Sequence, residues 1–244
     1  SMPMEPWNPA SEEPVTEAEL ELDRQRIEGD DLHAAMARRA GAHVTVARAI
    51  GVDAGARRIL LEGAPAVAYD LASFDIGSTV AGLEDPGVGE HALSTRPIGR
   101  FVARLGEIVE RAHRHDRDNP FRVVVVGGGA GGVEIAFTLS HRLAREAPAP
   151  VEVQLVDGGS RILPSYSESL VRRVQRRARA RGIAIRSRRH VIAAEARAAV
   201  LDDGQRLPCD ALVWVTGASS QPLFRDSGLA TDARGFVRVR STLQ

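Results

Sequence analysis

The chain has 244 residues, which is enough for one large domain or two small ones with a sizeable hydrophobic core. Its 32 acidic residues balance its 32 basic residues, and a pI of about 7.1 indicates no global attraction to nucleic acid or to an anionic membrane. All the basic residues are arginine, as is typical of a GC-rich bacterial genome, so lysine chemistry such as a Schiff base is excluded. One cysteine, Cys209, excludes an intrachain disulfide. Because no signal peptide and no apolar run long enough to cross a bilayer is found, we expect a cytoplasmic protein without a transmembrane segment.

The N-terminal part is predicted to be irregular and then to form two short helices. Residues 1–13 are rich in proline and glutamate, and Ser1 before Met2 resembles what remains of a cleaved expression tag. Thr16 and Glu19 have the spacing of a capping box, which predicts a helix to about residue 27. A second helix is expected over residues 32–40, with Gly41 at the position after its end.

Strand-like segments come next, and we expect an antiparallel hairpin or meander over residues 42–50, 57–62 and 66–69, with a turn at 53–55. Residues 69–76 predict one more short strand, which leads into the small-residue turn Gly77-Ser78-Thr79. Open α/β sheets bind ligands at the carboxyl ends of strands, so Gly77 and Ser78 are candidate binding residues. An ordinary loop is an equally good interpretation of this segment taken alone.

A long amphipathic helix is predicted from Pro97, which suits the first helical position, to about His115. Its apolar residues recur at steps of three and four, so one face is expected to be buried. These residues are Ile98, Phe101, Val102, Leu105, Ile108, Val109 and Ala112. Histidines and aspartates at the helix end could indicate a metal site, but no further ligand cluster accompanies them. A solvated helix end is the better interpretation, and no metal site is predicted.

The stretch FRVVVVGGGAGGVEIAF, residues 121–137, is the strongest functional signal in the sequence. Its first part predicts a strand buried on both faces, and residues 133–143 predict a helix. The glycines between them have the spacing G-x-G-x-x-G, which in this context binds the diphosphate of a dinucleotide. Gly127 permits the tight turn, Gly129 lets the diphosphate approach the backbone, and Gly132 lets the helix pack closely on the strand. The amides of this turn, which also contains Gly128, Ala130 and Gly131, face the phosphates at the positive end of the helix dipole.

A second buried strand, residues 151–156, ends in Asp157, about 25 residues after Gly132. This is near the spacing of about 20 at which an acidic residue binds the adenosine ribose, so Asp157 predicts NADH rather than NADPH as the ligand. Arg161 follows closely and could weaken that preference. The alternative is a glycine-rich corner between a strand and a helix that binds no ligand.

The remaining chain predicts a helix over 167–181 and several strands. Nine arginines lie in this helix or soon after it, at positions 172, 173, 176, 177, 179, 181, 186, 188 and 189. No aromatic residue accompanies them and a normal apolar stripe is present. A solvated face is therefore favoured over nucleic-acid binding, with a partner surface as the alternative. Strands are expected over 183–186, 191–195, 198–201, 211–215 and 235–240, with a hairpin turn at 202–204 and a small-residue turn at Thr216-Gly217-Ala218.

Several stretches together resemble the flavoproteins known as pyridine nucleotide–disulfide oxidoreductases, which have two dinucleotide-binding domains. They are VVVVGGGAGGVEIA, LVDGGSRILP, DGQRLPCDALVWVTGASSQP and GFVRVRSTLQ. Within that superfamily the chain is most similar to the branch of type II NADH dehydrogenases and sulfide–quinone reductases. The stretch YDLASFDIGST…GVGEHALSTRPIGRF resembles the NADH dehydrogenase-like flavoproteins associated with selenide, water dikinase. The resemblance covers about residues 30–244.

The resemblance implies an α/β fold in which a Rossmann-like NAD-binding domain, a parallel sheet with an antiparallel meander, is inserted into a partial FAD-type domain. The implied parts are an N-terminal segment over 1–29, FAD-type segments over 30–118 and 218–244, and the NAD(H)-binding domain over 119–217. By the same resemblance, the glycine turn would bind the NAD diphosphate and Asp157 its ribose.

Further roles are also implied by the resemblance. Thr216 and Gly217 would border the dinucleotides, while Gly77 and Ser78 would lie on the flavin side. Glu134 of the GVE motif would lie beside nicotinamide and flavin. An acid in the first turn of a helix is also favourable without any such role.

The chain departs from the family pattern at both ends. The strand–GxGxxG–helix that binds FAD in the family is not found in residues 1–41, and the later Gly-Asp motif would follow Gln244. NAD(H) is therefore the expected cofactor, whereas FAD is implied for full-length members and stays open for this chain alone.

The expected function is the NADH-binding part of an FAD-dependent oxidoreductase. It would transfer hydride from NADH to flavin and on to an electron acceptor that the sequence does not identify. The alternative is a flavin-free NAD-binding regulatory module without turnover, whose arginine-rich helix docks a protein or a fused domain. A short-chain dehydrogenase is disfavoured, because its Tyr-x-x-x-Lys pair needs a lysine.

Overall fold

The computed structural model describes residues 36–242, so the helix predicted at 16–27 lies outside the described residues. The described residues divide into two units, one of residues 36–48 with 62–64 and the other of residues 49–61 with 65–242. In the first unit the predicted helix end is confirmed. Gly41 has a φ of 65°, and its amide donates to the carbonyl of Arg38. The second unit contains every residue of the site described below.

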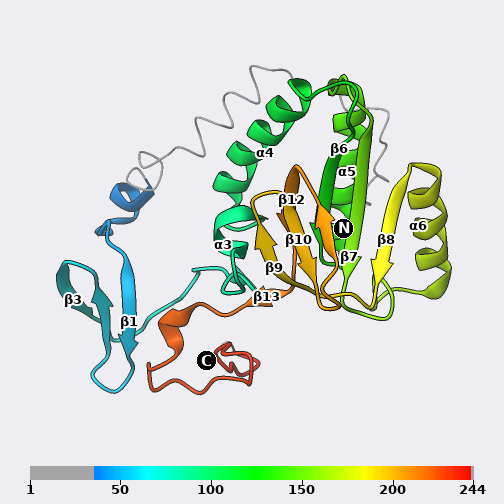
Figure 1. The fold of residues 1–244 in the computed structure, drawn as a ribbon. Helices are drawn as coiled ribbons and strands as arrows, with labels where there is room; N and C mark the ends of the chain where they lie inside the picture. Colours follow the sequence, from blue (N-terminus) through cyan, green and yellow to red (C-terminus); the bar gives the residue numbers. More distant parts are fainter. Residues whose placement is uncertain (1–35, 243–244) are drawn as a thin grey trace, which may run out of the picture. The chain divides into compact units, whose positions relative to one another are not determined.

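A five-stranded parallel sheet forms the core of the second unit (Figure 1). Its strands, in spatial order, are β5 (Leu93–Ser94), β12 (Ala211–Trp214), β6 (Phe121–Val126), β7 (Val151–Asp157) and β8 (Ile183–Ser187). Val126 of β6 is in register with Val156 of β7 and with Trp214 of β12, so the carboxyl ends of these strands lie side by side. The turns that follow them therefore meet at one end of the sheet.

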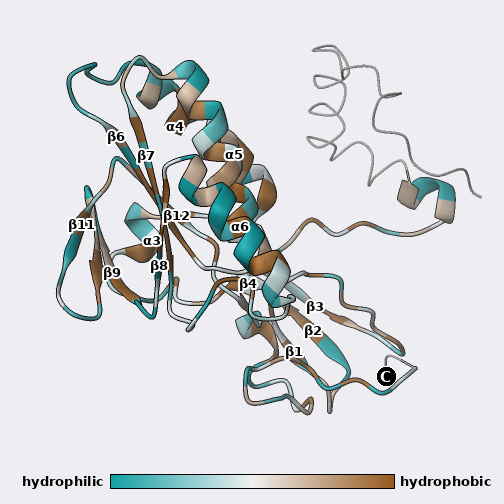
Figure 2. Cartoon of the chain, turned by 90° about the vertical axis from the view of Figure 1, so that its right-hand side faces the viewer, coloured by the Kyte–Doolittle hydropathy of each residue, from teal (hydrophilic) through white to brown (hydrophobic). Residues whose placement is uncertain are grey.

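Helices cover one face of this sheet and a small antiparallel sheet covers the other (Figure 2). Val123 and Val125 of β6 pack with the helices α4 (Ile98–His113), α5 (Ala130–Glu146) and α6 (Glu168–Ala180). Val124 and Val126 pack on the other side with the short helix α3 (Val88–His91) and with β9 (Val191–Glu195), β10 (Ala198–Leu201) and β11 (Arg206–Pro208). This alternation is the two-residue period of a strand. The predicted fold class, a Rossmann-like α/β protein with a parallel sheet and an antiparallel meander, is confirmed.

Two smaller sheets are also present. β1 (Ala49–Asp53), β2 (Arg58–Leu61) and β3 (Ala64–Ala68) form the sheet predicted at this place, and β1 pairs antiparallel with β2. β4 (Thr79–Val80) pairs antiparallel with β13 (Ala218–Ser219), and a 3-10 helix, η1 (Pro222–Phe224), follows. The β4–β13 pairing brings the segment around residues 77–82 alongside the segment that follows β12.

Three predicted strands differ from the structure. The first begins at Ala49 instead of residue 42, and residues 69–76 and 235–240 are not strands. A strand needs a neighbour that pairs with its backbone N–H and C=O groups. Residues 69–76 lie outside the described sheets, and Leu71 is 88% exposed. Near the C-terminal end, an isolated bridge joins Thr231 to Val237. The residue pattern predicted extended backbone but did not identify a neighbouring strand.

The helix predicted from Pro97 is confirmed as α4, but its buried face is narrower than predicted. Phe101, Ile108, Val109 and Ala112 are buried, whereas Ile98 and Val102 are 67% and 57% exposed. Ile98 lies in the first turn, which borders an open cleft. Among residues 36–242, every helix is too short or too polar to span a bilayer.

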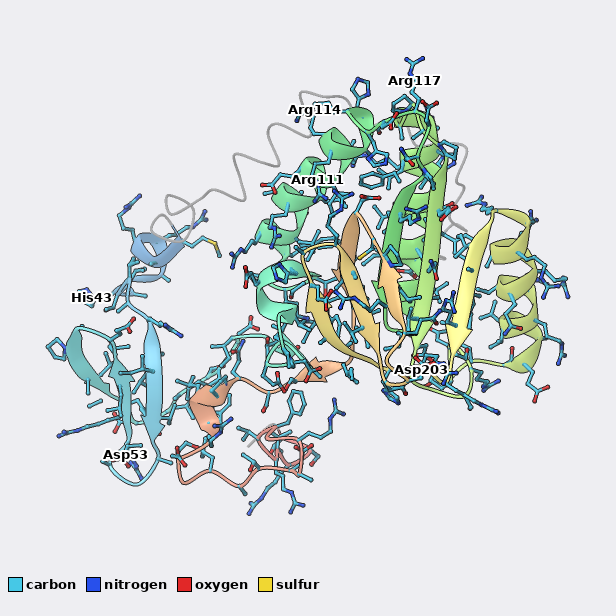
Figure 3. The ribbon with its side chains drawn as sticks, viewed as in Figure 1. His43, Asp53, Arg111, Arg114, Arg117 and Asp203 are labelled. Atoms are coloured by element: carbon cyan, nitrogen blue, oxygen red, sulfur yellow. The ribbon has the colours of Figure 1, made fainter. Side chains whose placement is uncertain are left out.

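A buried carboxylate joins several elements at the amino end of β12. Asp210 accepts hydrogen bonds from the backbone amide of Arg122 (2.9 Å) and from Nη2 of Arg197 (2.6 Å). Its carbonyl oxygen accepts from Arg111 of α4, labelled in Figure 3. Buried polar groups need such partners, and these fix α4 and β6 against β12.

Candidate functional site

The glycine turn between β6 and α5 is held by the neighbouring strand β7. The amide of Gly127 donates to the carbonyl of Val156 in β7 (2.8 Å). Gly129 is the N-cap residue of α5 and contributes no side-chain cap. The first amides of an α-helix have no carbonyl partner within the helix, so those of α5 are available to an anion at this end of the sheet.

Each named glycine of the motif has a different reason to lack a side chain. A Cβ on Gly127 would lie 2.2 Å from the carbonyl oxygen of Val215, and the residue has a φ of 117°. A Cβ on Gly132 would lie 1.8 Å from the carbonyl oxygen of Gly127, so α5 packs too closely on the turn for any side chain. Around Gly129, by contrast, no atom lies within 4 Å of such a Cβ. Gly129 therefore borders open space, as a close approach of a ligand to the backbone requires.

Asp157, the last residue of β7, is directly linked to this turn. Its Oδ1 accepts a hydrogen bond from the amide of Gly128 (2.9 Å), and a Cβ on Gly128 would lie 2.5 Å from its Cγ. A carboxylate has two oxygens that accept hydrogen bonds, so Oδ2 can accept from a ligand hydroxyl while Oδ1 holds the turn. The half-buried carboxylate lies beside the amides at the start of α5.

These elements border a cleft with a volume of about 1430 Å³. This exceeds the range of roughly 300–1,000 Å³ that is typical of small-molecule sites, so the cleft has room for a dinucleotide. The predicted site residues that line it are Gly77, Ser78, Gly127, Gly128, Gly129, Gly131, Gly132, Asp157, Thr216 and Gly217. The structure thus gathers residues from four separate parts of the sequence at one end of the sheet, although their binding roles stay predictions.

Three predicted site residues do not line the cleft. Ala130 is the first residue of α5 and packs against the core, and Glu134 is exposed on the first turns of α5. Arg161 donates from Nη2 to the carbonyls of Pro164 (2.8 Å) and Tyr166 (3.1 Å), so its guanidinium is bound to its own loop.

Trp214 and the segment around Ala81 form a part of the cleft that sequence reasoning missed. Trp214 is 2% exposed, and its Nε1 donates to the carbonyl of Ala81 (2.7 Å). The hydroxyl of Thr216 donates to the same oxygen (2.5 Å). A Cβ on Gly82, which has a φ of 81°, would lie 3.0 Å from the indole ring. The sequence feature that could have indicated this part of the cleft is the tryptophan at the end of a buried strand.

The loop after β8 supplies two further cleft residues that were not predicted, Arg189 and His190. The amide of Arg189 donates to the carbonyl of Asp157 (3.1 Å), which fixes this loop beside β7. His190 packs against Gly158 so closely that a Cβ there would lie 2.1 Å from Cε1 of the imidazole. The missing side chain at Gly158 leaves room for this imidazole.

The arginine-rich helix α6 and the two histidines near the end of α4, His113 and His115, are not among the residues that line the cleft. Arg173, Arg176 and Arg177 of α6 are exposed, and Figure 2 shows hydrophilic residues along this helix. Arg172 pairs with Glu168 one turn earlier (3.0 Å). No group of three or more His, Cys, Asp and Glu residues with metal-binding geometry is found in the part of the chain that the structure describes.

Cys209 is buried, and its chemistry can be tested directly. Burial, with a further contribution from the Asp210 carboxylate, raises the pKa of its thiol from 9.0 to about 11. Two pKa units correspond to about a hundredfold less thiolate, so alkylation by iodoacetamide at pH 8 should be about a hundredfold slower in native protein than in urea. The thiol ionises at a lower pH in the unfolded chain than in the folded protein. The free energy of unfolding should therefore decrease as the pH rises from about 9 to about 11. Equal alkylation rates in native and unfolded protein would contradict the burial.

The chain is similar to several curated proteins, of which it spans less than half the length. It is 28% identical over 192 residues to a probable NADH dehydrogenase from Dictyostelium discoideum, covering 72% of this chain and 43% of that protein. It is 26% identical over 189 residues to the NADH dehydrogenase-like protein YutJ from Bacillus subtilis, covering 76% of this chain and 49% of that protein.

Solved structures show the same fold at lower identity. Reduced CoADR-RHD from Bacillus anthracis superposes with a TM-score of 0.68 at 20% identity, covering 86% of this chain and 37% of that one. NDH2 from Plasmodium falciparum, solved in complex with NADH, gives a TM-score of 0.63 at 15% identity, covering 74% and 42%.

The family comparison covers nearly the whole chain. Residues 15–244 match the family described as pyridine nucleotide-disulphide oxidoreductase. The match includes the glycine turn, Asp157 and all the residues that line the cleft. The chain therefore belongs to the pyridine nucleotide-disulphide oxidoreductase family.

Proposed function

We propose that this chain is the NADH-binding part of an FAD-dependent oxidoreductase related to the NADH dehydrogenases, in which hydride passes from NADH to flavin. The observation that carries the proposal is the junction of β6, α5 and β7. There the free amides of α5, the open space at Gly129 and the Asp157 carboxylate all border one cleft. This combination fits a diphosphate joined to an unphosphorylated adenosine ribose.

The residues of the chain bind and orient the nucleotide. The amides at the start of α5 hold the diphosphate in the positive field of the helix dipole. Asp157 Oδ2 accepts a hydrogen bond from a ribose hydroxyl, and its negative charge repels the additional 2′-phosphate of NADPH. Trp214 and the β4–β13 pair form another part of the cleft wall, toward which the rest of the nucleotide would extend.

The flavin side of the cleft is part of the same proposal. Gly77 and Ser78 precede β4 and line the cleft, as contacts to a flavin would require. Bound flavin supplies the acceptor for hydride, so no acid–base triad is needed. We place the NAD(H)-binding domain at residues 119–217 and assign 30–118 and 218–244 to the FAD-type domain. Glu134 would face the nicotinamide in the complete protein, which we place in the reducing cytoplasm.

Two measurements test the proposal. Purified protein is titrated with NADH and with NADPH, and the expected result is tighter binding of NADH. Tighter binding of NADPH would refute the assignment of Asp157.

The absorption spectrum is then recorded with and without added FAD. A flavin band, followed by NADH oxidation with a quinone or a dye, supports the oxidoreductase. NADH binding without flavin or turnover would favour the alternative, a regulatory module whose exposed α6 arginines dock a partner.

Gly129→Ala is expected to weaken NADH binding by about tenfold or more, which corresponds to about 1.4 kcal/mol, and to cost at most about 1 kcal/mol of stability, because alanine is a poorer N-cap residue than glycine. Its added methyl group meets no protein atom within 4 Å and would occupy the space where the diphosphate approaches. The affinity is measured by NADH fluorescence titration and the stability by thermal unfolding. Gly106→Ala on α4, which also meets no atom within 4 Å and lies outside the cleft, is the matched control. Equal NADH affinity of Gly129→Ala and unaltered protein would contradict the proposed position of the diphosphate.

A further inference from the structure

Asp157 is not alone at its end of the cleft, because arginines capable of binding a 2′-phosphate lie close to it. Arg189 lines the cleft, and its backbone amide is hydrogen-bonded to the carbonyl of Asp157 (3.1 Å). Guanidinium groups bind phosphate well, because they can donate two parallel hydrogen bonds to it. A free arginine at this position would therefore counteract the selection of NADH by Asp157. The inference rests on the proposed function of the cleft.

Arg161, the arginine that the sequence singled out for such an effect, is held elsewhere. Its Nη2 donates to the carbonyls of Pro164 and Tyr166, at 2.8 and 3.1 Å. Those bonds turn its guanidinium into the 161–166 loop. Among the described arginines near Asp157, Arg189 is thus the one that lines the cleft.

Arg189 is also held, by a carboxylate far along the sequence. Its Nε lies 3.3 Å from Oδ2 of Asp203, in the turn between β10 and β11. Figure 3 labels Asp203 at the end of the parallel sheet where β7 and β8 terminate. The two elements are joined by backbone as well, because the amide of Asp202 donates to the carbonyl of His190 (2.9 Å). This backbone bond holds Asp203 beside Arg189 independently of the ion pair.

We propose that Asp203 is a specificity-determining positioning residue, which draws the guanidinium of Arg189 toward the β10–β11 turn and away from the adenosine 2′ position. Asp157 then meets the ribose without a competing cation, and NADH is selected over NADPH by two carboxylates on different elements. Asp203 does not contact the nucleotide itself. It acts through the side chain of Arg189.

Asp203→Asn tests this directly, because it keeps the size of the side chain and removes its charge. Both partners are partly exposed, at 47% and 38%, so their ion pair is of moderate strength. We expect the ratio of the NADPH and NADH dissociation constants to shift toward NADPH by about three- to fivefold at low salt, and by less at high salt. The gain lies in NADPH affinity, while NADH affinity stays unchanged. Binding is measured by fluorescence titration of the whole chain with each nucleotide.

Three further variants separate this role from a structural one. Asp202→Asn removes the same charge from the neighbouring residue of the same turn, which has no described ion pair with Arg189, and should leave the ratio unchanged. Asp203→Glu should restore the preference of the unaltered protein. Arg189→Ala combined with Asp203→Asn should abolish the gain, because no guanidinium remains to bind the 2′-phosphate.

An unchanged ratio in Asp203→Asn, or the same shift in Asp202→Asn, would overturn the role of Asp203 while NADH binding by the unaltered protein still stands. If the unaltered protein binds neither nucleotide, the proposed function itself is overturned, and this inference with it. The two failures are thus distinguishable in one titration series.

Discussion

Gly132→Ala is expected to destabilise the protein by about 3 kcal/mol or more, because no space exists for a single methyl group at this position. The added Cβ would lie 1.8 Å from the carbonyl oxygen of Gly127, which is backbone and cannot move aside as a flexible side chain could. Relief requires α5 to shift away from the turn, which would disturb its contacts with β6 and β7. The free energy of unfolding is measured by urea titration followed by far-UV circular dichroism.

The neighbouring glycine provides the matched control, with an expected effect of opposite sign. A Cβ on Gly131 would lie 3.5 Å from Cγ1 of Val215, an ordinary van der Waals contact. Gly131 lies in the first turn of α5, where alanine is favoured over glycine by about 0.5–1 kcal/mol. Gly131→Ala should therefore be as stable as the unaltered protein or slightly more so. If both variants were equally stable, the close packing of α5 on the turn would be wrong.

The elements predicted best from the sequence are those whose structure is determined by residues adjacent in the chain. The apolar strand at 121–126, the glycine spacing and the helix that follows each depend on residues adjacent in the chain. The same holds for α6, where Ser167 caps the helix by accepting from the amide of Leu170 (3.4 Å). Local pattern and tertiary packing agree there, so the prediction needed no knowledge of neighbours.

The failed predictions concern segments whose structure depends on a distant neighbour. Residues 69–76 have the composition of a strand, but pairing begins only at β4, with a partner more than a hundred residues away. On α4, the apolar pattern included Ile98 and Val102, although these side chains border open space instead of the core. The spacing of apolar residues shows which face of a helix is apolar, but it does not show how much of that face other elements cover.

The residues of the candidate site also fall into two groups, those that the sequence predicts and those that only the folded structure brings together. The glycine turn and Asp157 could be found from their spacing, because the motif fixes both. Arg189, His190 and Asp203 could not, because a loop after β8 and a hairpin between β10 and β11 meet only in the folded protein. Arg161 was the arginine nearest to Asp157 in the sequence, yet its own loop holds it away from the cleft.

Trp214→Ala is expected to cost about 3–5 kcal/mol of stability, because the indole is almost fully buried at the end of β12. It packs with Val124, Val126 and the residues of β9 to β11, and its Nε1 donates to the carbonyl of Ala81 (2.7 Å). Its loss would leave a cavity between the parallel sheet and the β9–β11 sheet, and would release the segment that leads from β4 into the cleft. Far-UV circular dichroism in urea measures the effect without relying on tryptophan fluorescence.

Trp214→Phe separates packing from the hydrogen bond. The phenyl ring fills most of the same space, and the carbonyl of Ala81 still accepts from the hydroxyl of Thr216 (2.5 Å), so a loss of only about 1–2 kcal/mol is expected. If phenylalanine were as damaging as alanine, the bond to Ala81 would dominate over burial. If alanine cost less than about 1 kcal/mol, the indole would not be part of a close-packed core. We therefore expect the free energy of unfolding to decrease from the unaltered protein to Trp214→Phe and then to Trp214→Ala. This order would show that one aromatic ring, packed between two sheets, stabilises this side of the cleft.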